Sequence, residues 1–168
     1  MAGYTVQGPF EVPVERLKGG RQIDRSSLPD FWATLGALAE TKGCYTFGMK
    51  AARGYMPIYV GKATKSFRQE CFGKHQRADH YNPALLQYLR ATPMLFLVAQ
   101  KTSRGKPGLK EIGELEKFLI QVGVARNPHL SNVHHTKQDT WSIDGVIRAA
   151  GGTSSRSSRA FKAMMKLK

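Results

Sequence analysis

The stretch GCYTFGMKAARGYMPIYVGKA, Gly43 to Ala63, holds two apolar segments on either side of a glycine-containing turn segment. Short runs rich in aromatic and β-branched residues and bounded by turn residues are typical of strands. We therefore expect strands at 44–49 and 57–62, joined as a hairpin. Each strand carries one tyrosine close to a glycine, Tyr45 on the first and Tyr59 on the second. Taken alone, such a pair indicates core packing in an ordinary hairpin.

Helix and strand patterns continue on both sides of this hairpin. A capping serine followed by Pro29 predicts a helix that ends at Gly43. The further elements that we expect are a helix at 65–74 capped by Thr64, a helix from Asn82-Pro83 to Arg90, a strand at 94–99, a helix at 109–123 with Ile112, Leu115, Leu119 and Val122 on one face, and a basic terminal helix. This order predicts an α/β (α+β) layer fold with a small three-stranded antiparallel sheet flanked by helices.

A length of 168 residues suits one domain with appended ends. Residues 1–27 are polar and turn-rich, and we interpret them as a loosely docked N-terminal arm. The domain itself is expected at 28–135. Residues 136–168 form a basic C-terminal extension.

The net charge of +14 indicates a polyanionic partner: DNA, RNA or an anionic membrane surface. Residues 61–110 hold ten Lys or Arg against two acids, and residues 148–168 hold six and no acid. No apolar run approaches the roughly 20 residues of a membrane span, so no membrane partner is expected. The start of the chain does not resemble a signal peptide, and two cysteines make no disulfide framework, so we expect a cytoplasmic location.

Common catalytic motifs do not occur: there is no Walker loop and no Cys/His spacing for zinc. What remains is an ordered set of Tyr45, Tyr59, Arg68 and Glu116. Phosphodiester cleavage needs a group that orients and activates a water, a cation for the charge on the phosphate, and a hard metal ion. Because Mg²⁺ often uses only one or two carboxylates, a single glutamate can suffice.

Gly43-Cys44-Tyr45, followed by Tyr59-Val60-Gly61-Lys62-Ala63, resembles the two signature tripeptides of the GIY-YIG nuclease superfamily. Cys44 stands where the family has an aliphatic residue. The family's later arginine and glutamate match Arg68 and Glu116, so the resemblance covers about residues 43–132. It implies a GIY-YIG-like fold and a metal-dependent endonuclease that hydrolyses double- or single-stranded DNA with one Mg²⁺ (or Mn²⁺). A monomer or weak dimer is expected.

The resemblance also implies roles for the matched residues. Tyr45 would activate or position the attacking water, and Tyr59 would hydrogen-bond water or phosphate. Arg68 would hold the scissile phosphate, Lys62 would contact it, and Glu116 would be the single protein ligand to the metal. Both tyrosine rings are then expected to rest on one face of the sheet with their hydroxyls in one cleft, where Arg68 and Glu116 converge on the same concave surface.

The sequence does not decide which residues of this chain match some of the family's site positions. An asparagine closes the family's domain, and Asn132 is our choice, with Asn127 as competitor. Many members carry a His or Tyr one helical turn after the arginine, where this chain has Phe72. His75 or His80 could replace it as a proton carrier or phosphate contact.

Other cations are candidate nucleic-acid contacts: Lys65, Lys74, His80, Arg104, Lys106, Arg156, Arg159 and Lys162. They suggest an alternative function, a non-catalytic nucleic-acid-binding module on the same fold. The departure at Phe72 is the best support for that alternative.

Overall fold

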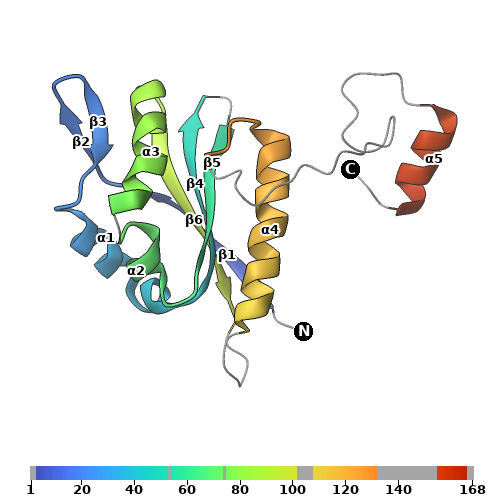
Figure 1. Ribbon diagram of the computed structural model, residues 1–168, viewed down its shortest axis with the longest axis horizontal. Coiled ribbons are helices and arrows are strands. Elements are labelled where there is room, and N and C mark those ends of the chain that lie inside the picture. Colours follow the sequence, from blue (N-terminus) through green and yellow to red (C-terminus); the bar gives the residue numbers. More distant parts are fainter. Residues whose placement is uncertain (1–2, 53, 74, 102–107, 132–154, 166–168) are drawn as a thin grey trace. The chain divides into compact units, whose positions relative to one another are not determined.

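The computed structural model describes residues 3–52, 54–73, 75–101, 108–131 and 155–165. Its contacts divide the chain into two units, Met1–Val133 and His134–Lys168. The first unit is a sheet with helices against both faces (Figure 1). The second contains helix α5, Arg156–Met165. The expectation of a mixed fold with antiparallel strands is confirmed.

The main sheet has four strands rather than the predicted three, in the order β1-β6-β4-β5. The strands are β1 (Tyr4–Glu11), β4 (Gly43–Ala51), β5 (Gly54–Ala63) and β6 (Thr92–Gln100). All three pairings are antiparallel, and β1 pairs with β6 from Tyr4↔Gln100 to Glu11↔Met94. The segment interpreted as an arm therefore supplies the fourth strand. Its apolar signal is weak because β1 is an edge strand with most of its residues exposed.

The same N-terminal segment forms a second, two-stranded sheet from β2 (Val14–Leu17) and β3 (Gly20–Ile23). Arg21 fastens this hairpin to helix α3, His75–Gln87, by donating hydrogen bonds to the backbone oxygens of Leu85, Tyr88 and Ala91. These oxygens belong to the last turn of α3 and to the turn that follows it, so the guanidinium caps the end of the helix. The hairpin is thus anchored, not loosely docked.

The first helix begins after Ser27 as predicted but ends earlier, and the second begins later than predicted. Helix α1, Leu28–Leu35, stops at Gly36, whose φ of 54° suits glycine, and a 3₁₀ helix, η1 (Gly36–Glu40), follows. Helix α2, Phe67–Cys71, is capped by Ser66, whose side chain accepts from the Gln69 amide. The predicted cap, Thr64, lies outside the helix.

The Asn82-Pro83 pair does not open a helix, because α3 already begins at His75 and Pro83 lies inside it. Proline removes one helical hydrogen bond, but Tyr81 and Leu85 on either side are fully buried and hold the helix against the sheet. Helix α4, Leu109–Arg126, runs slightly further than predicted. Its buried face is Ile112, Ile120, Gly123 and Val124, whereas Val122, predicted to share that face, is 51% exposed.

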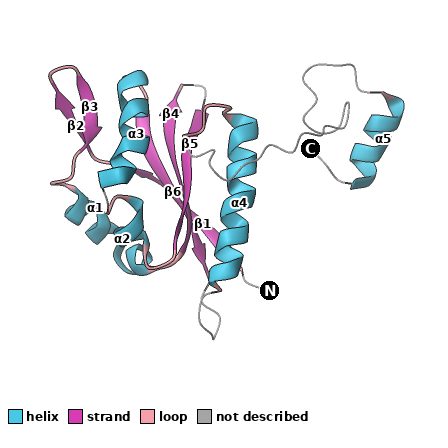
Figure 2. Ribbon diagram, viewed as in Figure 1, coloured by secondary structure: helices cyan, strands magenta, loops and turns pink. Residues whose placement is uncertain are grey.

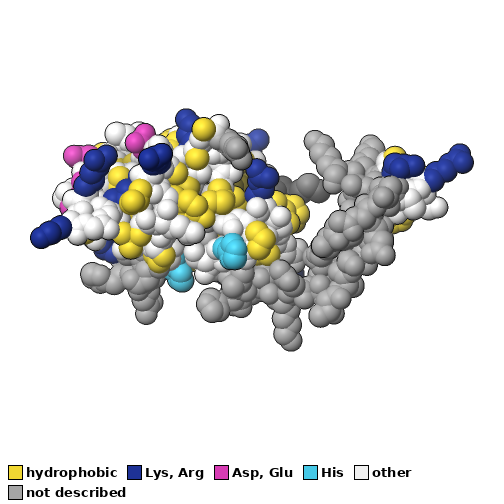
Figure 3. Space-filling model, turned by 90° about the horizontal axis from the view of Figure 1, so that it is seen from above, with side chains coloured by type: hydrophobic (Ala, Val, Ile, Leu, Met, Phe, Trp, Pro, Cys, Tyr) yellow, Lys and Arg dark blue, Asp and Glu magenta, His cyan; other side chains and the backbone are white. Residues whose placement is uncertain are grey.

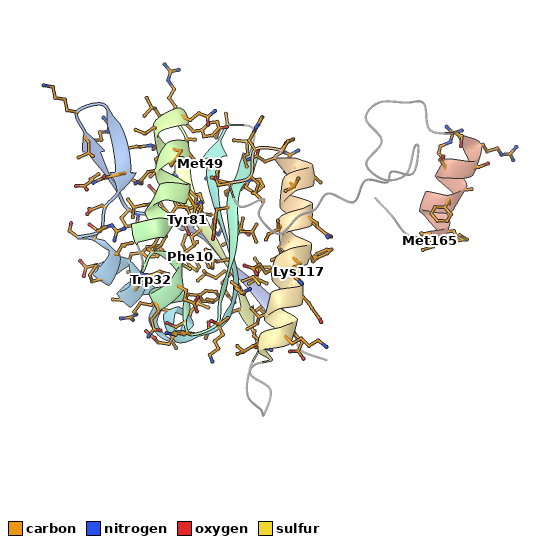
Figure 4. All side chains as sticks on the ribbon, in the orientation of Figure 1. Phe10, Trp32, Met49, Tyr81, Lys117 and Met165 are labelled. Atoms are coloured by element: carbon orange, nitrogen blue, oxygen red, sulfur yellow. The ribbon has the colours of Figure 1, made fainter. Side chains whose placement is uncertain are left out.

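The sheet separates two hydrophobic clusters. The larger cluster lies between the sheet and α1, α2 and α3, where Trp32, Phe47, Phe67 and Tyr81 are buried. The smaller cluster joins β5 to α4 through Val60, Ile120, Val124 and Leu130. Figure 2 shows the helices on the two sides, and Figure 4 labels Trp32 and Tyr81 on one side and Lys117 on α4. No helix within the described ranges has both the length and the apolar character that crossing a membrane requires.

Candidate active site at the edge strand

Tyr45 and Tyr59 lie on the same face of the sheet. Tyr45 pairs with Gly61 across the hairpin, and Phe47 pairs with Tyr59. Side chains two positions apart on a strand share a face, and directly paired residues do too. The two rings stack with centroids 6.1 Å apart and an interplanar angle of 27°. The expectation that both rings rest on one face is confirmed.

Gly61 is a glycine because the Tyr45 ring covers it. A Cβ on Gly61 would lie 2.5 Å from both Cζ and Oη of Tyr45 and 2.9 Å from Cε1 of Tyr59. No side chain fits at those distances without moving an aromatic ring. The second tripeptide therefore has a structural basis: its glycine makes room for the hydroxyl end of the first tripeptide's tyrosine.

The two tyrosines differ in their access to solvent. Tyr45 is 1% exposed, and its hydroxyl donates to the backbone oxygen of Glu70 at 3.5 Å. Tyr59 is partly exposed and stacks on His80, with ring centroids 5.0 Å apart. Of the two histidines left open by the sequence, His80 is therefore next to the tyrosine pair. The side chain of His75 lies outside the described residues.

Lys62 and Glu116 meet on the opposite face of the sheet. Val60 packs on Ile120 and Val124 of α4, and Lys62, two positions further along β5, extends toward the same helix. Lys62 Nζ donates to Glu116 Oε2 at 2.8 Å. The Glu116 side chain is only 14% exposed and that of Lys62 is 44% exposed. The expected single concave surface is thus divided: the tyrosines face α2 and α3, and Glu116 faces the other side of β5.

Cys44 belongs to this second face and is not a nucleophile. It pairs with Lys62 across the hairpin, and its thiol donates to the Ile112 backbone oxygen at 3.4 Å. Burial, reinforced by the negative charge of Glu116, raises the pKa of the Cys44 thiol to about 12. A thiol of this kind stays protonated and acts as a small apolar group.

Arg68 projects from α2 and pairs with Glu40 of η1, Nε to Oε1 at 2.7 Å. Both side chains are about half exposed, at 48% and 55%. An ion pair this exposed is weak, so the guanidinium can exchange its carboxylate for a phosphate at small free-energy cost.

Glu70 is a residue that the sequence interpretation missed. Its Oε1 accepts from the Thr64 amide (2.6 Å), the Thr64 hydroxyl (2.9 Å) and the Lys65 amide (2.7 Å). The loop that follows Lys62 is therefore held by Glu70, whose backbone oxygen also accepts from Tyr45. The signal that could have revealed it is an acid in the first turn of a helix capped by serine.

The asparagine that braces this region is Asn127, at the end of α4. It is 5% exposed, donates to the Pro57 backbone oxygen at 2.7 Å and accepts from the His129 amide at 3.0 Å. Asn132, the asparagine chosen from the sequence, lies outside the described residues, so its place is not tested. Phe72 is buried against Phe31, Trp32 and Tyr81, so that position serves packing.

The remaining candidate phosphate contacts are only partly placed. Lys65 is exposed in the loop after β5, and Arg156 and Arg159 are exposed on α5. The other candidates lie outside the described residues or have side chains that do: Lys74, Arg104, Lys106 and Lys162.

Glu116 is the candidate metal ligand. Among the described residues, no three His, Cys, Asp or Glu side chains gather to hold an ion. One carboxylate, already paired with Lys62, does not fit a tightly caged Ca²⁺ or Zn²⁺. It does fit a hydrated Mg²⁺ that arrives with substrate phosphate, because such an ion needs one or two carboxylates and keeps several waters.

No family model matches the chain, and neither the curated proteins nor the solved structures that were compared with it give a match.

Proposed function

We propose that this chain is a metal-dependent endonuclease that hydrolyses DNA phosphodiester bonds, with a fold and mechanism of the GIY-YIG type. The observation that carries the proposal is the arrangement along the end of β5. On one face of the sheet lie Tyr59 and Gly61, and the Tyr45 hydroxyl covers Gly61. On the other face, Lys62 pairs with Glu116. Because β5 is an edge strand, a substrate lying against its end at 59–62, beyond the Pro57 and Ile58 oxygens to which the segment after α4 bonds, reaches both faces.

Burial changes the roles of the two tyrosines in this mechanism. The partly exposed Tyr59, rather than the buried Tyr45, orients the attacking water. Tyr45 stacks against the Tyr59 ring and so fixes the orientation of that ring. His80, stacked on Tyr59, stands where it can receive the proton that leaves the water. The water oxygen bonds to phosphorus while the bond to the leaving sugar oxygen breaks.

The cations act on the phosphate. Arg68 leaves Glu40 and forms charge-assisted hydrogen bonds to non-bridging oxygens, and Lys62 contributes a second positive group. Glu116 would hold Mg²⁺ or Mn²⁺ through one carboxylate and waters, and the bound ion would supply Lewis-acid stabilisation of the leaving oxygen. The net charge of +14 favours binding of the polyanion in a salt-dependent way.

A cleavage panel tests this proposal: supercoiled, linear and single-stranded DNA and RNA, each with Mg²⁺, Mn²⁺ or EDTA. Glu116→Ala is expected to lower the cleavage rate at least about 100-fold while DNA affinity changes little, because a metal ligand stabilises mainly the transition state. Glu114→Ala is the matched control, since Glu114 is an exposed acid on the same helix. Arg68→Ala should reduce both cleavage and affinity.

Wild-type rates in Glu116→Ala and Arg68→Ala would refute the mechanism. The second candidate is a nucleic-acid-binding module without catalysis, favoured by Phe72, which is packed in the core where a polar group would be expected. DNA affinity that falls with salt but is unchanged by EDTA, with no cleavage of any substrate, would support this second candidate.

A further inference from the structure

A hollow of about 290 Å³ opens at the turn end of the β4–β5 hairpin. It is lined by Met49, Ala51, Gly54, Tyr55, Met56, Tyr88, Ala91 and Arg126. Figure 3 views this end of the sheet and shows hydrophobic side chains gathered there, with Lys and Arg side chains nearby. None of the roles proposed above uses this hollow, so its chemistry calls for a separate explanation.

The lining has the composition of a stacking site. Tyr55 is 42% exposed, although it packs edge-on against Phe96 at 5.4 Å between centroids. Tyr88 and two methionines, Met49 and Met56, add further polarisable side chains to the lining. Exposed aromatic rings of this kind stack on nucleobases, whatever the base.

Cations accompany these rings. The Arg126 side chain is part of the lining, and Lys50 Nζ lies 5.9 Å from the centroid of the Tyr55 ring. A planar ligand that carries a phosphate would therefore meet an apolar wall and two cationic groups together. The volume lies at the lower end of the range for ligand pockets, which suits one base rather than a larger molecule.

The hollow lies on the same strand as the candidate active site. Tyr55 is six positions before Gly61 on β5, and at about 3.3 Å per residue the two are roughly 20 Å apart. One nucleic-acid strand with about 3.4 Å between stacked bases covers that distance in about six nucleotides. A strand that spans this distance, passing over the segment 127–131 that bonds to Pro57 and Ile58, can thus present a phosphate near Gly61 and a base at Tyr55.

We propose that this hollow is a subsite for an unpaired nucleobase, so that the substrate is DNA with a single-stranded segment about six nucleotides from the cleaved bond. The inference rests on the proposed function for the meaning of that distance. It narrows the substrate class, because a base in a closed duplex is stacked between its neighbours and does not present its face to Tyr55.

The test uses the full chain in EDTA, which separates binding from cleavage. A single-stranded oligonucleotide with one 2-aminopurine, and the same sequence as a closed duplex, report affinity by anisotropy and stacking by fluorescence. Tyr55→Ala is expected to weaken single-strand binding by about 5- to 100-fold and to relieve the quenching of 2-aminopurine. Duplex affinity should change by less than about 2-fold.

Three further variants control this result. Tyr55→Phe keeps the ring and should bind as wild type, whereas Tyr55→Leu keeps apolar bulk for folding and should lose the stacking signal. Phe118→Ala removes an exposed ring on α4, 58% exposed and outside the hollow, and should have no effect. Equal affinities of wild type, Tyr55→Ala and Tyr55→Leu for the single strand would overturn the subsite, as would an equal loss on duplex.

Glu116→Ala distinguishes failure of the subsite from failure of the proposed function. If Tyr55→Ala weakens single-strand binding but neither the wild type nor any variant cleaves DNA in Mg²⁺, the subsite holds and the endonuclease proposal fails. If wild type cleaves and Glu116→Ala does not, while Tyr55→Ala binds normally, the endonuclease proposal holds and the subsite fails.

Discussion

Substituting Gly61 by alanine tests the packing on which the candidate site depends. The added Cβ would lie 2.5 Å from Cζ and Oη of Tyr45 and 2.9 Å from Cε1 of Tyr59. Tyr45 is 1% exposed, so its ring cannot swing into solvent. Overpacking of a core costs about 1–3 kcal/mol, and two rigid rings place this site at the upper end. We expect Gly61→Ala to lower the free energy of unfolding by about 2–3 kcal/mol.

Gly113→Ala is the matched control for this variant. Gly113 lies inside α4, and a Cβ there meets nothing within 4 Å. The same chemical change should therefore stabilise the protein by about 0.5–1 kcal/mol through helix propensity. The two alanine variants are thus expected to differ by about 3 kcal/mol. In a domain of this size that difference corresponds to roughly 6–12 °C in Tm.

Urea denaturation followed by far-ultraviolet circular dichroism measures both free energies. A double-mutant cycle then identifies the clash: in a Tyr45→Leu background, the shorter side chain makes room, and Gly61→Ala should cost at least about 1 kcal/mol less. If Gly61→Ala is as harmless as Gly113→Ala, or if Tyr45→Leu leaves its cost unchanged, then Tyr45 does not cover Gly61 and the geometry of the site is wrong.

Two further predictions concern groups that stabilise the fold around the site. Folding raises the pKa of Cys44 from 9.0 to about 12, so the thiol is protonated in the native state where it ionises in the unfolded state. Below about pH 9 the Cys44 thiol does not change the free energy of unfolding with pH; between pH 9 and pH 12 it lowers that free energy by about 1.4 kcal/mol per pH unit. Cys44→Ala should flatten this part of the curve of unfolding free energy against pH. An unchanged slope would contradict the assignment. Arg21→Ala removes the side chain that bonds three backbone oxygens at the end of α3 and should lower the free energy of unfolding by about 2–4 kcal/mol in urea, whereas loss of less than about 0.5 kcal/mol would show that solvent replaces the cap.

The hairpin could be predicted because its pattern is local. Apolar residues bounded by glycines indicate two strands whatever the rest of the chain does, and the rings of Tyr45 and Tyr59 share a face through strand pairing alone. The fourth strand could not be predicted in this way. Residues 4–11 mix apolar and polar side chains around Gly8-Pro9 and are mostly exposed, and they become a strand because β6 offers an unpaired edge.

The side-chain partners were harder to predict, for the same reason. Lys62 and Glu116 lie 54 positions apart in the chain, and their ion pair depends on how α4 crosses β5. The pairing of Arg68 with Glu40 depends on where α1 ends, and the sequence placed that end at Gly43 instead of Gly36. Sequence motifs named the candidate site residues without indicating which of them face each other.

The position of β5 in the sheet connects these observations. Alternation along a strand sends Tyr59 and Lys62 to opposite faces, so in a central strand the sheet would separate them. The N-terminal strand adds to β6, at the far edge, and leaves β5 as the other edge. Within the described residues, the segment 127–131 after α4 covers that edge near its middle, where Asn127 donates to the Pro57 oxygen and the Ser131 amide donates to the Ile58 oxygen. The tyrosine end of β5 and the hollow lie on either side of this covered stretch, so a DNA strand that contacts both must pass over residues 127–131.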